Sequence, residues 1–478
     1  MRFTAQILSE DEQYRIHKMS LRILEEVGIR FHGDLAPKIL GEHGIKLNPE
    51  DRIAKIPAEF VEQALKTAPK SFVLGARNPA YNFTVPATYT RYGLDGTAAF
   101  ALDFLTGEKR YGTSKDIENA LRIFQHMDMG VMAWAPTCAA DIPASIRAVY
   151  EFFSTARFSS KHGEHELHTV AQVPYLEEGL VAIMGSQDAL RKSHAYSLIY
   201  CPVAPLTHDG QMLDAYLELG EMDLPVMVMP MPVNGTTGPA SLYSNIALAN
   251  AETLSSVVIY QLAHPGRPMI FSSSTATIDF RSGAYLAGVP EMALQTAGLA
   301  VMGKYYGFPT SGAGFTSDAK QGGPEAVMEK IITTLPSVLA GADILIGFGE
   351  IESDQLLILE QIVVDNEIAH IFQRLVEGID CSEEKDLFDD IARIGPGGHF
   401  LAAKSTRKAA RTTEFLTTQL IDHHAYESWL ELGKPAMYKK AREVVEQILS
   451  QPAADPLPEE VEAKLDQILK KAEKTING

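Results

Sequence analysis

The sequence predicts an α/β protein built as a (β/α)8 TIM barrel with an N-terminal mixed α/β cap and a C-terminal helical extension. From about residue 114, short apolar runs alternate with longer segments of helical periodicity, which is the pattern of βα units. Successive apolar runs begin roughly 25 to 43 residues apart, near the ~30 residues that a strand, a crossover helix and their loops require. No G-x-G-x-x-G turn follows the first run, which disfavours the alternative of an open doubly wound sheet.

The cap is predicted to occupy residues 1–90. Ser9 followed by Glu12 forms a capping-box pattern, and apolar residues then recur at helical spacing until Gly28, which predicts a first helix. The periodicity of 57–68 predicts a second one. The cap is therefore expected to combine helices with a few extended segments.

The barrel is predicted to occupy 91–380. Residues 81–105 are expected to be extended and broken by turns, one of them at Asp95-Gly96. Seven strands are predicted at 131–135, 156–160, 195–201, 225–231, 268–273, 308–312 and 343–348. Helices are predicted between them at 142–155, 212–222, 242–262, 290–305 and 324–339. The eighth strand has no clear position. Residues 381–478 are predicted to form a helical extension that packs on the barrel or on a second subunit.

Composition excludes several classes of function. The chain carries 42 Lys and Arg against 61 Asp and Glu, a formal charge of −19, which disfavours binding to nucleic acid and to anionic membranes. Its three cysteines, Cys138, Cys201 and Cys381, are too few and too dispersed for a disulfide framework or a thiolate zinc site. Neither a signal peptide nor a run of about 18 apolar residues occurs. These features predict a cytoplasmic protein.

Glycine-rich loops follow several predicted strands, where the active site of such a barrel is built. These loops are 231–239, 272–279, 311–320 and 348–350. Their small residues allow a ligand to approach the backbone, and Asn234, Asp318, Lys320 and Glu350 provide polar groups. The alternative interpretation is that the glycines only satisfy tight turns.

Three histidines with the spacing H-x-x-H-x-x-H, namely His162, His165 and His168, raise the possibility of a zinc site. Gly163 interrupts helical continuity and no cysteine lies nearby. A solvated loop with scattered histidines is therefore the preferred interpretation, and no metal site is predicted.

Two lysines and one cysteine near strand ends suggest covalent chemistry. Lys161 or Lys320 could form a Schiff base, as in aldolase-type barrels, although an ion pair with Asp318 is the expected role of Lys320. Cys201 ends a predicted strand, where a buried structural thiol is more common than a nucleophile. None of these residues forms a decisive catalytic motif.

An ordered series of strings resembles the trimethylamine methyltransferase family over essentially the whole chain. The series consists of Met231-Pro-Val-Asn-Gly-Thr-Thr-Gly-Pro239, Ala251-Glu252, Pro290-Glu291, Ser317-Asp-Ala-Lys320, Gly395-Pro-Gly-Gly-His-Phe-Leu401, Asp422, Trp429 and Gly433. The resemblance implies a barrel that passes a methyl group from an amine to the cobalt of a corrinoid carried by a separate partner protein. A homo-oligomer is also expected.

The resemblance further indicates the class of amine. Trimethylamine enzymes of the family carry pyrrolysine, whereas this chain has no non-standard residue and reads Gln321-Gly-Gly-Pro-Glu325 beyond the Asp-x-Lys string. It is therefore more similar to members that demethylate quaternary amines. Glycine betaine is the expected substrate, with proline betaine, carnitine and γ-butyrobetaine as alternatives.

A quaternary amine explains why no metal or nucleophile motif is needed. Its nitrogen is already positively charged, so transfer of the methyl group releases a neutral amine, and the protein has only to align the cation and exclude water. A trimethylammonium group has no N–H to donate and calls for aromatic faces. The residues predicted to bind it are Trp134, Tyr200, Phe315 and Phe348.

Carboxylates and donors complete the predicted site. Glu350 and Asp318 are the predicted catalytic carboxylates, because they can balance the charge of the cation. Asn234, His399 and backbone N–H groups from Gly312 to Gly314 are predicted to bind the carboxylate of a betaine. Two other functions stay open, namely a lysine-dependent aldolase or isomerase and a quaternary-amine binding protein.

Overall fold

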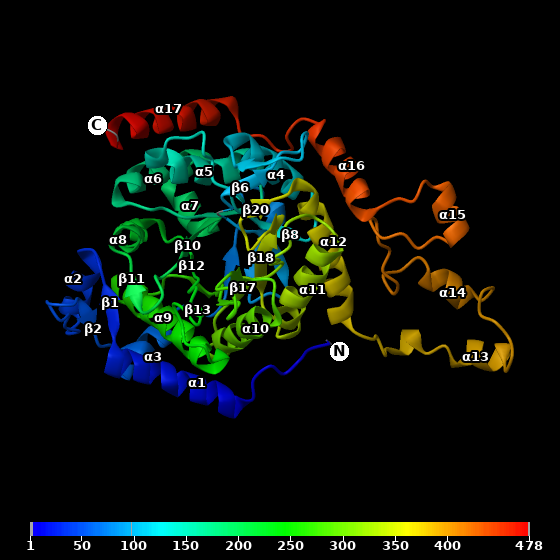
Figure 1. Cartoon of the computed structure of the whole chain (residues 1–478), viewed down its shortest axis with the longest axis horizontal. Coiled ribbons are helices and arrows are strands. Elements are labelled where there is room, and N and C mark those ends of the chain that lie inside the picture. Colours follow the sequence, from blue (N-terminus) through cyan, green and yellow to red (C-terminus); the bar gives the residue numbers. More distant parts are fainter. Residues whose placement is uncertain (1–2, 97, 477–478) are drawn as a thin grey trace.

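Eight parallel strands form a closed barrel in the computed structural model, which describes residues 3–96 and 98–476 (Figure 1). The strands are β5 (Arg91–Leu94), β8 (Gly130–Ala133), β9 (His162–His165), β10 (Tyr196–Tyr200), β12 (Val226–Val228), β14 (Met269–Phe271), β17 (Ser311–Ala313) and β18 (Ile344–Phe348). Strand β18 pairs with β5, and Phe271 N–H donates to Pro309 O at 2.9 Å, which joins β14 to the segment leading into β17. The predicted barrel is confirmed.

The strand that the sequence did not place is β5, the first of the barrel, inside the extended segment 81–105. One prediction is wrong, because residues 156–160 are not a strand. Helix α5 (Ala144–Phe158) continues through most of them, and the strand of this unit is β9. A short apolar run suits either a buried strand or the end of a buried helix, so periodicity alone did not separate the two. Each of the other predicted strands overlaps an observed one.

Helices cover the outside of the barrel. They are α4 (Ser114–Gln125), α5, α6 (Val173–Met184), α7 (Gln187–Ser193), α8 (Gly210–Glu218), α9 (Leu242–Ala263), α10 (Pro290–Tyr305), α11 (Pro324–Leu339) and α12 (Leu359–Glu377). Among the described residues, only α9 has the length and composition to span a membrane, and 89% of its apolar window is buried. It packs against α10 and against three helices of the cap, one of which is α2 (Leu35–Glu42), as expected of a helix that is apolar on all sides.

The cap begins with α1 (Glu10–Arg22), and the predicted capping box is present. Ser9 N–H donates to Glu12 Oε2 at 2.8 Å, and Glu12 N–H donates to Ser9 Oγ. One π-helical turn extends the helix to Gly28, whose φ is 88° and whose added Cβ would lie 2.7 Å from Ala54 O. Helix α3 (Ala58–Thr67) is also confirmed, and both helices pack on α9.

A hairpin closes the amino ends of the barrel strands. It consists of β3 (Phe72–Leu74) and β4 (Phe83–Val85), and its Leu74 and Val85 are fully buried. Gly75 N–H donates to His194 O at 3.0 Å, and Gly75 O contacts His162 Nδ1 at 2.8 Å. Since His162 begins β9, the hairpin lies at the amino end, and only the carboxyl ends of the strands are left for a ligand site.

The C-terminal region returns to the barrel in two helices. Helix α16 (Met437–Leu449) packs on α12 and α4, and α17 (Glu459–Ile476) packs on α5 and α6. Before them, α13 (Phe388–Ile394), α14 (Lys404–Ala409) and α15 (Tyr426–Glu431) extend to one side of the barrel (Figure 1). The division into regions 1–90, 91–380 and 381–478 stays a prediction, because packing does not test independent folding.

A fully buried ion pair connects α11 and α12 to the end of β18. Lys330 Nζ lies 2.9 Å from Asp365 Oδ2, and neither side chain is exposed. Lys330 also donates to Gly347 O at 3.2 Å, while the Asp365 carboxylate accepts from Gly349 N–H and Gln361 Nε2, each at 2.8 Å. Both charges are thus surrounded by hydrogen bonds, which a buried pair requires.

We expect Lys330→Met to lower the free energy of unfolding by about 3–5 kcal/mol, because it leaves the Asp365 carboxylate buried without a partner. The double variant Lys330→Met/Asp365→Leu should lose less than the single variant. Urea denaturation followed by circular dichroism measures both. Lys192→Met is the matched control, since its exposed pair with Asp188 contributes about 0–1 kcal/mol. A single variant as stable as the control would contradict the assignment.

Candidate active site

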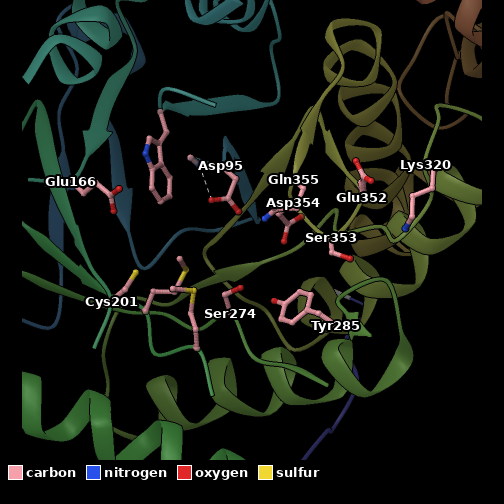
Figure 2. A pocket seen from close by; sticks show the side chains of 14 residues that line it. Asp95, Glu166, Cys201, Ser274, Tyr285, Lys320, Glu352, Ser353, Asp354 and Gln355 are labelled. Carbon is pink, nitrogen blue, oxygen red and sulfur yellow. Dashed lines mark hydrogen bonds between the residues drawn. The ribbon is translucent and has the colours of Figure 1, made fainter. Parts of the chain in front are cut away.

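A cavity of about 540 Å³ lies at the carboxyl ends of the barrel strands (Figure 2). It is lined by Asp95, Gly96, Trp134, Glu166, Cys201, Met229, Met231, Ser274, Tyr285, Lys320, Glu352, Ser353, Asp354 and Gln355. Lys320, Gln355 and Met231 are exposed, so the cavity opens to solvent. Asp95, Trp134, Cys201 and Met229 follow directly after four different barrel strands, as expected of a barrel active site.

Trp134 forms one wall of the cavity and is only 2% exposed. A Cβ on Gly96 would lie 2.1 Å from the indole, so only glycine lets the ring occupy this place. His165 meets the indole edge to face with a centroid separation of 6.5 Å, and its Nε2 lies 3.2 Å from Glu151 Oε2. The indole Nε1 is buried without a hydrogen-bond partner. The ring is thus held in place beside the cavity.

Carboxyl groups dominate the polar lining. Asp95, Glu166, Glu352 and Asp354 line the cavity, and Lys320 is the one cationic side chain in the lining as described. Asp95 and Asp354 lie near the centre of the view, Glu166 at the left above Cys201, and Lys320 at the right edge (Figure 2). The site therefore holds an excess of groups that become negative when they ionise.

Burial and mutual repulsion raise the pKa values of several carboxyl groups in and beside the cavity. Burial, followed by the nearby Asp354, raises the pKa of Asp95 well above its usual range. Burial raises the pKa of Asp354 to about 6, and the charge of Lys330 limits the rise. Glu164, on β9, has a pKa raised by burial to about 8. A bound cation would reverse this trend, because it stabilises the ionised forms.

The two predicted catalytic carboxylates lie next to the cavity and not in its lining. Glu350 is fully buried, neither of its oxygens has a hydrogen-bond partner, and burial with the nearby Asp95 raises its pKa well above the ordinary value. Asp318 is half-buried and accepts from Ala287 N–H at 2.9 Å and from Ser353 Oγ at 2.6 Å. Asp318 thus positions a serine that lines the cavity, and a catalytic role for either carboxylate stays a prediction.

Only one of the four predicted cage aromatics, Trp134, reaches the cavity. The ring centroids of Phe315 and Phe348 lie 4.8 Å apart, and the two rings meet edge to face. Both rings also contact Tyr92 in the same buried cluster. Tyr200 is buried, and its hydroxyl lies 2.7 Å from His208 Nδ1. These three rings fill the core of the barrel and its helical layer.

The predicted carboxylate-binding groups are also used elsewhere. Asn234 is buried, donates to Pro239 O at 2.7 Å and accepts from Gln295 Nε2, so it shapes its own loop. Gly312 lies in β17, and the following N–H groups of Ala313 and Gly314 donate within the barrel wall. His399 is exposed in the segment between α13 and α14, and the structure does not bring it to the cavity.

The interpretation as a solvated loop is wrong for His162 and His165, whereas His168 is exposed in the loop that follows β9. His162 and His165 are buried in β9, because the strand of this unit begins later than predicted. His162 Nε2 lies 2.8 Å from Ser197 Oγ, and Ser197 Oγ donates to Glu164 Oε1 at 3.1 Å. In the part of the chain that the structure describes, no group of three His, Cys, Asp or Glu side chains is placed to hold a metal ion.

The two lysines differ in position. Lys161 donates to Phe124 O at 2.8 Å and to Met127 O at 2.6 Å at the amino end of β9, opposite the cavity, although burial lowers its pKa to about 7. Lys320 lines the cavity and donates to the backbone carbonyl of Asp318, whereas an ion pair with the Asp318 carboxylate was expected. The carboxylate instead accepts from Ser353.

Cys201 also lines the cavity, and burial followed by Glu166 raises its pKa well above the usual value. A cysteine in such an environment stays a thiol, which is a poor nucleophile.

Sequence reasoning missed Asp95, Glu166 and Asp354. Asp95-Gly96 was interpreted as an ordinary turn, yet it ends the first barrel strand. The signal was weak, because Asp95 and Gly96 follow a short run, Arg91–Leu94, that is less apolar than the later strands. Glu166 follows β9 and was hidden by the misplaced strand at 156–160.

Comparisons with known proteins agree with this geometry. A family model described as trimethylamine methyltransferase (MTTB) matches residues 2–477. The chain is 31% identical to the glycine betaine methyltransferase of Desulfitobacterium hafniense (strain Y51), covering 96% of this chain and 95% of that protein. It is 29% identical to the trimethylamine methyltransferase MttB of Methanosarcina barkeri, covering 99% and 96%. Its fold matches the monomethylamine methyltransferase MtmB of Methanosarcina barkeri with a TM-score of 0.51, 12% identity and coverage of 99% and 88%.

We expect Gly96→Ala to displace the Trp134 indole, because the added methyl group would overlap the ring. In a Trp429→Phe background, Trp134 is the only tryptophan, so its fluorescence reports the change directly. The emission maximum should shift to longer wavelength as water reaches the ring. Gly41→Ala is the control, since nothing lies within 4 Å of its added Cβ. Equal spectra for the two variants would contradict the close contact.

Proposed function

Because the chain belongs to the trimethylamine methyltransferase (MTTB) family and is a methyltransferase, we propose that it moves a methyl group from a quaternary amine to a corrinoid carried by a partner protein. The observation that carries the proposal is the cavity, in which one tryptophan wall faces several carboxyl groups. Glycine betaine is the first candidate substrate, and the similarity to a glycine betaine methyltransferase supports it.

The lining suits a trimethylammonium group. Such a cation has no N–H to donate, so it is attracted to an aromatic face and to negative charge without a directional hydrogen bond. Trp134 supplies the face, while Asp95 and Asp354 supply charge once a cation lowers their pKa values. A neutral tertiary amine would gain much less from these carboxyls. The site therefore favours the charged substrate.

The carboxyls also help the product to leave. When the methyl group is transferred, the nitrogen becomes neutral and the cavity loses one positive charge. Asp95, whose pKa burial and the nearby Asp354 raise well above its usual range, then regains a proton from solvent through the open cavity mouth. Repulsion among the carboxylates is relieved, and the neutral amine is held less tightly than the cation that entered. Binding and release of the cation are thus linked to proton release and uptake.

The corrinoid supplies the cobalt nucleophile that accepts the methyl group. The open mouth of the cavity fits this requirement, because exposed Lys320, Gln355 and Met231 stand at its edge and leave the interior reachable. This chain's residues hold the cation at a fixed depth with one methyl group toward the mouth. Lys320 lies across the cavity from Glu166 (Figure 2), where its charge can attract the carboxylate of a betaine.

No observation favours the two alternative functions. A Schiff-base enzyme would need a free amine in the cavity, whereas Lys161 lies at the opposite end of the barrel and Lys320 donates to a backbone carbonyl. A pure binding protein would leave the similarity to methyltransferases unexplained. The cytoplasmic location stays a prediction.

The proposed reaction is tested by following cob(I)alamin absorbance with a panel of quaternary and tertiary amines. We expect turnover with glycine betaine and no turnover with trimethylamine, because a quaternary nitrogen departs as a neutral amine, whereas an unprotonated tertiary amine would have to depart as an amide anion. Lys161→Met should be as active as wild type. Activity confined to tertiary amines would overturn the proposal, and loss of activity in Lys161→Met would revive the Schiff-base alternative.

Replacing Trp134 with leucine should weaken glycine betaine binding about tenfold, because a buried cation–π contact contributes roughly 1–2 kcal/mol. Isothermal titration calorimetry measures the Kd. Phe348→Leu is the matched control, since its ring lies in the core cluster and does not line the cavity. An equal loss in both variants would indicate general disturbance of the barrel and would contradict the role of Trp134.

Cation binding should depend on pH through Asp354. Its pKa of about 6 means that the carboxyl is mostly neutral at pH 5 and mostly ionised at pH 7. The Kd for glycine betaine should therefore fall about tenfold between these values, as expected for one titrating group. Asp354→Asn should abolish most of this dependence, whereas Glu352→Gln should retain it. A pH profile that is unchanged in Asp354→Asn would contradict the assignment.

A further inference from the structure

Residues 379–432 form an extension that we call the arm, and its helices lack a core. In the described structure no residue of α13, α14 or α15 is buried. These helices have only six or seven residues each, and helices shorter than about 12–15 residues are marginal in water without packing. Their helical form therefore requires a surface that covers them.

The arm is also unusually apolar on its outside. Its exposed large apolar residues are Ile379, Leu387, Phe388, Ile391, Phe400, Leu401, Phe415, Leu416, Tyr426, Leu430 and Leu432. Phe388 and Ile391 stand three positions apart on α13, so they share one face, and they are 69% and 56% exposed. Leu401 is 83% exposed. Patches of this extent on a globular protein mark contact surfaces.

The area is sufficient for a permanent interface. If each of these side chains loses about 100 Å² on contact, one arm buries roughly 1,000 Å², and two arms exchanged across a two-fold axis bury at least 2,000 Å². That range is typical of obligate homodimers, whose interfaces are more apolar than those of transient complexes. A partner that must dock and leave in every catalytic cycle would return these apolar side chains to water each time it left. The surface therefore suits a permanent partner better than a transient one.

Charge favours a second copy of the same chain. Lys404, Arg407, Lys408 and Arg411 are all exposed on and just after α14, and none is in an ion pair within the described residues. The chain as a whole carries a charge of −19. A basic segment on an acidic protein is attracted to another copy of that protein.

The root of the arm offers a place for such an exchange. An apolar groove of about 990 Å³ lies there, lined in part by Phe3, Leu375 and Ile379. A two-fold axis near the groove presents the same surfaces to both copies. Each arm then contacts the same surface of the other copy, and the assembly closes as a dimer.

We propose that the arm packs on the barrel of a second copy of this chain, so that the protein is an arm-exchanged homodimer. The apolar side of α13 and the segment around Leu401 form the contact, and the basic residues of α14 meet acidic side chains of the other copy. This inference does not depend on the proposed methyl transfer, because mass and protection from exchange are measured without substrate.

Sedimentation equilibrium of the full chain at about 10 µM gives the first test. We expect twice the chain mass of 52.3 kDa for the wild type and a single chain mass for Phe388→Asp/Leu401→Asp. Leu105→Asp is the matched control, since Leu105 is 86% exposed outside the arm, and this variant should remain dimeric. A monomeric wild type, or a Phe388→Asp/Leu401→Asp variant that stays dimeric, would overturn the proposal.

Hydrogen–deuterium exchange provides a second measurement that does not depend on perfect folding of the variant. Backbone amides of α13–α15 should be protected in the wild type and should exchange rapidly in Phe388→Asp/Leu401→Asp, with protection of β5 and β18 unchanged. Cross-linking a mixture of light and isotopically heavy chains should join Lys404 or Lys408 of one copy to a carboxylate of the other. Cross-links only within one chain would show that the arm folds on its own barrel.

Discussion

Negative charge that is buried around one cavity is the constraint that organises this molecule. Asp95, Glu164, Glu350 and Asp354 come from strands β5, β9 and β18 or follow them, and each has a pKa raised by burial. Burying an isolated ionised carboxylate costs free energy, so such a group is stable either in its protonated form or beside a bound cation. The closed amino end of the barrel and the open carboxyl end decide from which side that cation arrives.

The supporting structure keeps these groups in place. The Lys330–Asp365 pair holds the backbone at Gly347 and Gly349, immediately beside Glu350. Its positive member also limits the pKa of Asp354. On the other side, Gly96 leaves space for Trp134 and places the Asp95 carboxyl next to the indole. The aromatic wall and the charged wall are thus set by neighbouring strands, which a barrel keeps at a fixed separation.

The arm follows a different principle from the barrel. Helices α16 and α17 bury residues such as Val445 and Leu465 against the barrel and are stable within one chain, whereas α13–α15 bury none. The chain packs on its own barrel before the arm, in α12, and after it, in α16. The arm between them is left open to contact with another molecule. Under the two proposals, the barrel would carry catalysis and the arm would carry assembly.

Local patterns determined the barrel, most of its helices and the Ser9 capping box, because strand and helix periodicity depend on neighbouring residues. The same patterns placed Trp134 near the end of a predicted strand, 131–135. They did not distinguish Trp134, which lines the cavity, from Phe315 and Phe348, which also stand at strand ends but lie in the core. The direction of a side chain depends on what packs around it. Nor did these patterns reveal Asp95, Glu166 and Asp354 as one group, since these residues are distant in sequence and meet only when β9, β8, β5 and β18 pair side by side. Which carboxyls share a cavity, and therefore which ones keep a proton, was decided by closure of the barrel, because electrostatic interactions depend on distance in space.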